Sequence, residues 1–71
     1  MANHVYSISE VVGSSPDSIE AAVSNAVTQA AKTVRNLDWF EVQSIRGQLL
    51  EGRIEHWQVT VKLGFRIEGA G

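Results

Sequence analysis

The spacing of hydrophobic residues changes twice along the chain and divides it into segments of two kinds. Residues 5–12 are rich in β-branched and aromatic side chains mixed with serine and glutamate, which predicts a strand. Both faces of this strand carry apolar residues, so the pattern does not fix its register. Residues 13–17 are predicted to break the strand, with Ser15 as the N-cap of a helix and Pro16 in its first turn.

The next segment has the strongest periodic signal. Its apolar residues recur at steps of three and four, with one adjacent alanine, which places them on one stripe of a helix. The stripe consists of Ile19, Ala22, Val23, Ala26, Val27, Ala30, Ala31, Val34 and Leu37. We predict a helix that ends at residues 36–38, with Lys32 and Arg35 near its negative C-terminal end. Because the stripe is rich in alanine, the helix is expected to lie close to its sheet.

Two more strands are predicted after the helix. Residues 39–50 form the first, although their alternation is imperfect, and Glu51-Gly52 suits a tight hairpin turn with glycine at positive φ. Residues 54–67 form the second and alternate cleanly. One face of this last strand carries Trp57, Val59, Val61, Leu63, Phe65 and Ile67, and the other carries His56, Gln58, Thr60, Lys62 and Arg66.

The order β-α-β-β predicts an α+β fold, in which a single helix covers one face of a three-stranded antiparallel sheet. The final hairpin places the last strand between the other two. Residues 1–71 are expected to form a single domain. The sheet face opposite the helix is left bare in this arrangement, so that face and the sheet edges are expected to provide subunit contacts and a ligand site.

Chain length and composition add an expectation of oligomerisation. A domain of 71 residues removes only about 60% of its unfolded surface from water, so its core alone gives marginal stability. The chain has no cysteine, and its two histidines, His4 and His56, do not belong to any cluster with the spacing of a zinc site. Disulfides are thereby excluded and no metal is expected. Association between subunits is therefore expected to supply the stability that the small core lacks.

The charge distribution narrows the classes of partner. The net charge is −2, and six basic residues are scattered among eight acidic ones, so no basic stripe is present to bind nucleic acid. The first residues show no charged start followed by an apolar run, and no segment approaches the roughly 20 apolar residues that span a bilayer. The sequence therefore predicts a cytoplasmic protein without membrane association.

Catalytic residues are not expected in this chain. No serine has a plausible neighbouring base, and the glutamates are dispersed as on a solvated surface. Gly13, Gly47, Gly52 and Gly64 do not form a phosphate-binding loop, and they predict turns, bulges or close approaches of the backbone.

The two tryptophans differ in what their positions predict. Trp57 lies on the apolar side of the last strand, which favours a core position under the helix. Trp39 directly follows the predicted helix end, and its position leaves two alternatives open: packing onto the helix terminus, which is slightly favoured, or projection from the bare sheet face. Arg46, Lys62 and Arg66 are typical of solvated or ion-paired residues, but Arg66 shares a face with Gln58 and suits an anionic ligand there.

Three segments of the sequence closely resemble the dodecins. They are the opening from Tyr6 to Pro16, the run Leu37-Asp38-Trp39-Phe40-Glu41-Val42-Gln43-Ser44-Ile45-Arg46-Gly47, and the run His56-Trp57-Gln58-Val59-Thr60-Val61-Lys62-Leu63-Gly64-Phe65-Arg66. The resemblance covers nearly the whole chain. It implies a flavin-binding protein of β-α-β-β fold that assembles as a homododecamer with pairs of flavins at subunit interfaces.

The resemblance also implies roles for four residues. Trp39 matches the family tryptophan that stacks on the isoalloxazine ring, and Gln58 matches the glutamine that hydrogen-bonds the polar edge of that ring. Arg46 and Arg66 match family arginines near the ligand phosphate or the subunit interface, which points to FMN as the cofactor. The ranking of FMN against riboflavin and FAD stays open, as does coenzyme A as a further ligand.

The function implied by this resemblance is storage and sequestration of flavin. A flavin stacked between an indole and a second flavin has both faces covered, so substrate cannot reach it for hydride transfer, and electron transfer from the indole is expected to quench its photochemistry. Two alternatives remain, namely a catalytic flavoprotein and a purely structural homo-oligomer.

Overall fold

A computed structural model describes residues 3–68 of the chain and contains three strands and one helix. The elements are β1 (Tyr6–Ser15), α1 (Ile19–Ala30), β2 (Leu37–Leu50) and β3 (Arg53–Arg66). The strand order is β1-β3-β2, and both strand pairs are antiparallel. The predicted α+β fold is therefore confirmed. Met1 and Ala2, on which the expectation of no targeting segment partly rests, lie outside the described residues.

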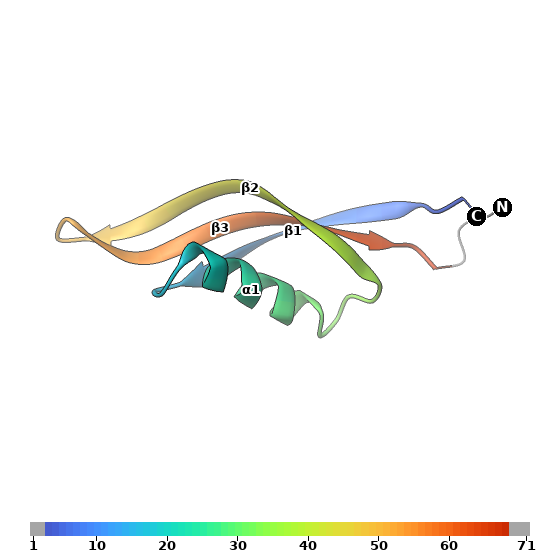
Figure 1. Ribbon diagram of the computed structural model, residues 1–71, viewed down its shortest axis with the longest axis horizontal. Helices are drawn as coiled ribbons and strands as arrows, with labels where there is room; N and C mark the ends of the chain where they lie inside the picture. The colour runs from blue at the N-terminus through green and yellow to red at the C-terminus, as the bar shows by residue number, and fades with distance from the viewer. Residues whose placement is uncertain (1–2, 69–71) are drawn as a thin grey trace.

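The helix lies across one face of the sheet, and the β2–β3 hairpin extends well beyond it (Figure 1). The molecule measures 56 × 20 × 13 Å along its principal axes, so it is thin and elongated. No helix within residues 3–68 is long and apolar enough to cross a membrane.

A small core holds α1 against β1 and β3. Its buried members are Ala22, Ala26, Val59, Val61 and Leu63. The helix comes very close to the sheet at Gly13 of β1, where a Cβ atom would overlap the carbonyl oxygen of Ala22 and press on the Cβ of Ala26. The alanine-rich stripe thus permits the close approach that the sequence predicts.

The start of the helix differs from the prediction, because the N-cap is Ser18 and not Ser15. The Ser18 side chain accepts a hydrogen bond from the Ala21 amide at 3.0 Å, as an N-cap does. Ser15 is instead the last residue of β1, is buried, and accepts a hydrogen bond from the Asp17 amide at 3.0 Å. The predicted break at residues 13–17 is therefore too early, since β1 continues to Ser15 and the turn holds only residues 16–18.

The helix also ends earlier than predicted, at Ala30 instead of residues 36–38. Lys32 and Thr33 close the last turn with i→i+3 hydrogen bonds, and Asn36 then adopts a left-handed conformation with φ 65°. The Arg66 amide donates to the Asn36 carbonyl at 3.1 Å, which ties this loop to the end of β3. The pairing of Leu37 with Phe65 in the sheet thus takes precedence over continuation of the helical stripe.

The hairpin turn is at the predicted position. Glu51 and Gly52 connect β2 to β3 and have positive φ values of 51° and 76°. Two consecutive left-handed residues match the right-handed twist of the flanking strands.

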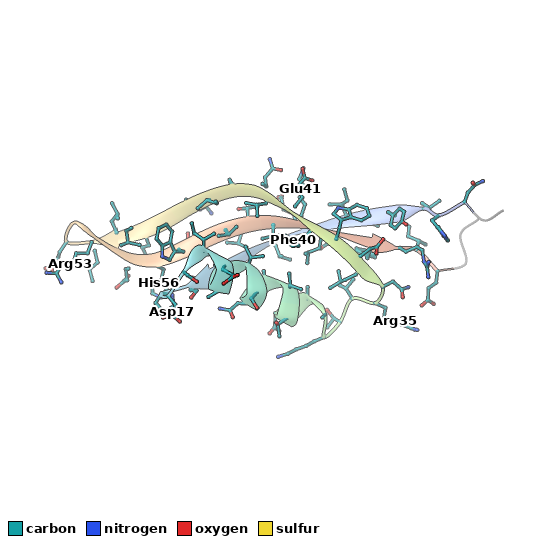
Figure 2. The ribbon with its side chains drawn as sticks, viewed as in Figure 1. Asp17, Arg35, Phe40, Glu41, Arg53 and His56 are labelled. Atoms are coloured by element: carbon teal, nitrogen blue, oxygen red, sulfur yellow. The ribbon has the colours of Figure 1, made fainter. Side chains whose placement is uncertain are left out.

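The helix leaves β2 largely uncovered on its own side of the sheet. Phe40, Val42 and Ile45 pair with the buried β3 residues Leu63, Val61 and Val59, which places their side chains on the helix side. All three are nevertheless exposed, Phe40 by 56%. Figure 2 shows Phe40 on the side of α1 and its neighbour Glu41 on the opposite side. An apolar strip beside the helix therefore has no cover within the described chain.

Candidate functional site

The site is built on the sheet face that points away from α1, which we call the helix-free face. Since Val59, Val61 and Leu63 are buried under the helix, the alternate residues of β3 point the other way. Their cross-strand partners on β1 and β2 share that face. By this register, the helix-free face carries Gln58, Thr60, Lys62, Gly64 and Arg66 of β3, Tyr6, Ile8, Glu10, Val12 and Ser14 of β1, and Trp39, Glu41, Ser44 and Arg46 of β2.

A bulge at the start of β2 decides where Trp39 points. Leu37 pairs with Phe65 on the helix side, and two residues further along a regular strand Trp39 would face the same way. The register instead shifts between Leu37 and Trp39, so that Asp38 is the extra residue and Trp39 pairs with Gly64. Trp39 is thereby placed on the helix-free face, which decides between the two alternatives that its sequence position left open.

The Trp39 indole lies over Gly64 of the central strand. A Cβ atom built on Gly64 would overlap the fused bond of the indole, with Cε2, Cζ2 and Cδ2 as its three nearest atoms. The ring therefore rests on bare backbone. Trp39 is still 41% exposed, so a large part of the indole is available to a ligand or to another subunit.

Tyr6 of β1 contacts the indole from the side. The two ring centroids are 5.0 Å apart and the ring planes are tilted by 59°, which is within the range of favourable aromatic pairs. Tyr6 pairs with Arg66 across β1 and β3, so Tyr6, Trp39 and Arg66 gather at one end of the helix-free face.

Gln58 and Arg46 lie at a different place on the same face. They are direct cross-strand partners of β3 and β2. Gln58 is half-buried and Arg46 is exposed, and within residues 3–68 neither side chain makes a hydrogen bond or an ion pair. Both have their polar groups free for a ligand as far as the described chain is concerned.

The two halves of the predicted site are far apart in one chain. Gly64, beneath Trp39, and Gln58 are six residues apart along β3. At the usual rise per residue this separation is about 20 Å. The structure therefore brings Trp39 together with Arg66 and Gln58 together with Arg46, but it does not bring the two pairs together.

Trp57 and His56 lie towards the hairpin end of β3, away from Trp39. Trp57 lies on the helix side, partly buried against the core, as predicted. No three His, Cys, Asp or Glu side chains in residues 3–68 are close enough together to hold a metal ion. His56 is half-exposed near the hairpin, and its Nδ1 lies 3.7 Å from the Glu55 carboxylate.

Two residues that shape the site were missed by sequence reasoning. The sequence predicts Tyr6 only as part of the first strand, and Gly64 only as one of four glycines at turns, bulges or close approaches of the backbone. A useful signal for Gly64 is that a glycine interrupts an otherwise strongly alternating strand, which is typical of a position where another group approaches the backbone.

The fold and the site together define a class of small α+β proteins with a three-stranded sheet open on one face, an exposed tryptophan on that face and a small core. Comparison with known proteins identifies the family. The dodecin family model matches residues 5–68, and the chain belongs to the dodecin family.

Individual relatives agree with this assignment. A dodecin from Thermus thermophilus is 47% identical over 64 residues, which is 90% of this chain and 93% of that protein. The solved structure of dodecin from Streptomyces coelicolor has a TM-score of 0.92 at 57% identity, covering 99% of this chain and 100% of that one. Dodecin from Streptomyces davaonensis gives 0.90 at 49% identity, covering 94% and 98% of the two chains.

Proposed function

We propose that this chain stores and sequesters FMN or riboflavin by stacking the flavin ring on Trp39 in a homododecamer. The observation that carries the proposal is the indole on the helix-free face, resting on Gly64 and 41% exposed, in a chain of the dodecin family. An exposed indole offers the large flat π-face that a planar heteroaromatic ring prefers.

The other candidate residues fit the remaining parts of a flavin. The Gln58 amide can donate and accept hydrogen bonds at once, which suits the pyrimidine-like edge of the ring. Arg46 lies beside Gln58 and Arg66 lies near Trp39, and guanidinium groups suit the phosphate of FMN. The phosphate is thus the feature by which the arginines would favour FMN over riboflavin.

The distance between the two half-sites supports binding between subunits. A single flavin ring cannot contact Trp39 and Gln58 of one chain across about 20 Å, so a second chain must provide one of them. The exposed apolar residues on both sides of the sheet also favour association, since burial of such a surface is the main driving force for stable oligomers.

A non-catalytic role follows from the same stacking. With the indole on one face and a second flavin on the other, the ring would be closed to substrate, and within residues 3–68 no serine or threonine hydroxyl is hydrogen-bonded to a histidine or a carboxylate. Electron transfer from the indole would compete with the photochemistry of the bound ring. We therefore expect flavin fluorescence to be strongly quenched on binding.

The visible absorption spectrum of the purified protein, followed by titration of FMN and riboflavin read by flavin fluorescence, tests the proposal. Yellow protein, or saturable quenching on titration, is the expected result. Colourless protein that leaves flavin fluorescence unchanged would instead indicate a purely structural oligomer. Steady oxidation of NADH by the FMN-loaded protein would indicate a catalytic flavoprotein.

A further inference from the structure

We infer that Tyr6 and Gly64 are positioning residues that hold the Trp39 indole in one orientation before a ligand binds. This inference rests on the proposed function only for its effect on flavin affinity. The ordering of the indole itself is a property of the ligand-free protein, so it can be tested separately.

The backbone of Gly64 lies under one face of the Trp39 indole. The nearest atoms to its missing Cβ are Cε2, Cζ2 and Cδ2, which are the two fusion atoms of the indole and a neighbour, so the middle of the ring system lies above the glycine. Any side chain at position 64 would have to displace the ring. Because one face of the indole lies on the backbone, the opposite face is the one presented for stacking.

The Tyr6 ring contacts the indole on the side of β1. Its ring is inclined by 59° to the indole at 5.0 Å, which limits rotation of the indole towards β1. Tyr6 is itself held by the pairing of β1 with β3, where it is opposite Arg66. Each strand therefore contributes one residue to this arrangement: β2 carries Trp39, Gly64 of β3 lies under its ring, and Tyr6 of β1 contacts the side of the ring.

A fixed indole lowers the entropic cost of binding. A large side chain that is free to change rotamer must be immobilised when a ligand stacks on it, whereas a side chain that is already ordered does not pay this cost. Loss of the Tyr6 ring is therefore expected to weaken flavin binding about 2- to 10-fold while all direct flavin contacts remain.

The first experiment follows the indole in the absence of flavin. Trp57→Phe makes Trp39 the only tryptophan, and time-resolved fluorescence anisotropy of the intact oligomer then reports on its local motion. Tyr6→Ala is expected to increase the fast component of the anisotropy decay and to weaken FMN binding. Tyr6→Phe keeps the ring and is expected to restore both properties. Ser24→Ala, at an exposed position of α1 and so away from the helix-free face, is the control and is expected to change neither.

The second experiment tests the role of Gly64 by a double-mutant cycle. Gly64→Ala is expected to lower the Tm when Trp39 is present and to have much less effect in the Trp39→Ala background, where no ring lies over position 64. Because the comparison is between two backgrounds, it remains informative even if Gly64→Ala is strongly destabilising by itself.

The outcomes separate the two ideas. Unchanged indole motion in Tyr6→Ala, or an equal effect of Gly64→Ala in both backgrounds, would overturn the positioning role. A parent protein that binds no flavin while Tyr6→Ala loosens the indole would overturn the proposed function and leave the positioning role intact.

Discussion

Trp39 of β2 and Gln58 of β3 share the helix-free face of the sheet, but Gly64, the cross-strand partner of Trp39, lies six positions from Gln58 along β3. Each has an arginine close to it in the register, Arg66 near Trp39 and Arg46 opposite Gln58. One chain therefore presents the residues of the proposed site as two separate pairs. On the proposed function, a flavin that contacts both pairs lies between two chains, so flavin binding is expected to depend on assembly.

Replacement of the aromatic platform should have the largest effect on affinity. Trp39→Ala removes the stacking surface and is expected to weaken FMN binding by about 1–3 kcal/mol, as is typical for one aromatic partner of a base-like ring. Quenching of the residual bound flavin should also decrease. Titration of FMN fluorescence gives both quantities, and Trp57→Phe, which alters the other indole on the helix side, is the control expected to bind like the parent. Equal affinity of Trp39→Ala and the parent would remove Trp39 from the site.

Complementation between chains tests the division of the site. If each site takes Trp39 from one chain and Gln58 from another, oligomers co-assembled from Trp39→Ala and Gln58→Ala chains contain some sites with both residues intact. A fraction of sites with the parent affinity should then appear in an FMN titration of the co-expressed, doubly tagged oligomer. The same variants purified separately should lack that fraction. If one chain supplied both residues, co-expression would not restore any site.

The fold was predictable because each element carries its own local signal. The three- and four-residue spacing from Ile19 onward, the alternation of residues 54–67 and the Glu51-Gly52 turn all agree with the element order that the structure shows. The ends of the helix were not predictable to the same degree. Ser15 and Ser18 are both suitable N-caps by residue type, and only the pairing of Ser15 with Trp57 in the sheet decides between them.

The site was predictable from the sequence only in part. Gln58 and Arg66 follow from the clean alternation of β3, because that strand has no bulge between them. The direction of the Trp39 side chain cannot be derived in this way. It depends on the extra residue Asp38, and the bulge at that residue interrupts the alternation of the strand. The contact of Trp39 with Tyr6 joins the first and second strands of the chain across the central one, so only the assembled sheet reveals it.

The helix N-cap can be verified by comparing two serines. Ser18→Ala removes the acceptor of the Ala21 amide and is expected to cost about 1 kcal/mol of stability. Ser24→Ala, on the exposed side of the same helix, is the control and should be neutral or slightly stabilising, because alanine is the better helix former. Thermal unfolding at a single protein concentration is the appropriate measurement, since the stability of an oligomer depends on concentration. A larger loss from Ser24→Ala than from Ser18→Ala would contradict the assigned cap.

The close contact between helix and sheet predicts a strong effect at Gly13. A methyl group there would overlap the Ala22 carbonyl and press on Ala26, and since both belong to the helix packed on β1, the whole helix would have to move away from the sheet. Gly13→Ala is therefore expected to destabilise the protein by about 3 kcal/mol, the upper part of the range for overpacking. Ser14→Ala, at the next and exposed position of β1, should stay within about 0.5 kcal/mol of the parent. Guanidinium chloride unfolding followed by far-UV circular dichroism measures both variants. A Gly13→Ala protein as stable as Ser14→Ala would show that the helix can shift at little cost and that its close approach to β1 is not needed for the fold.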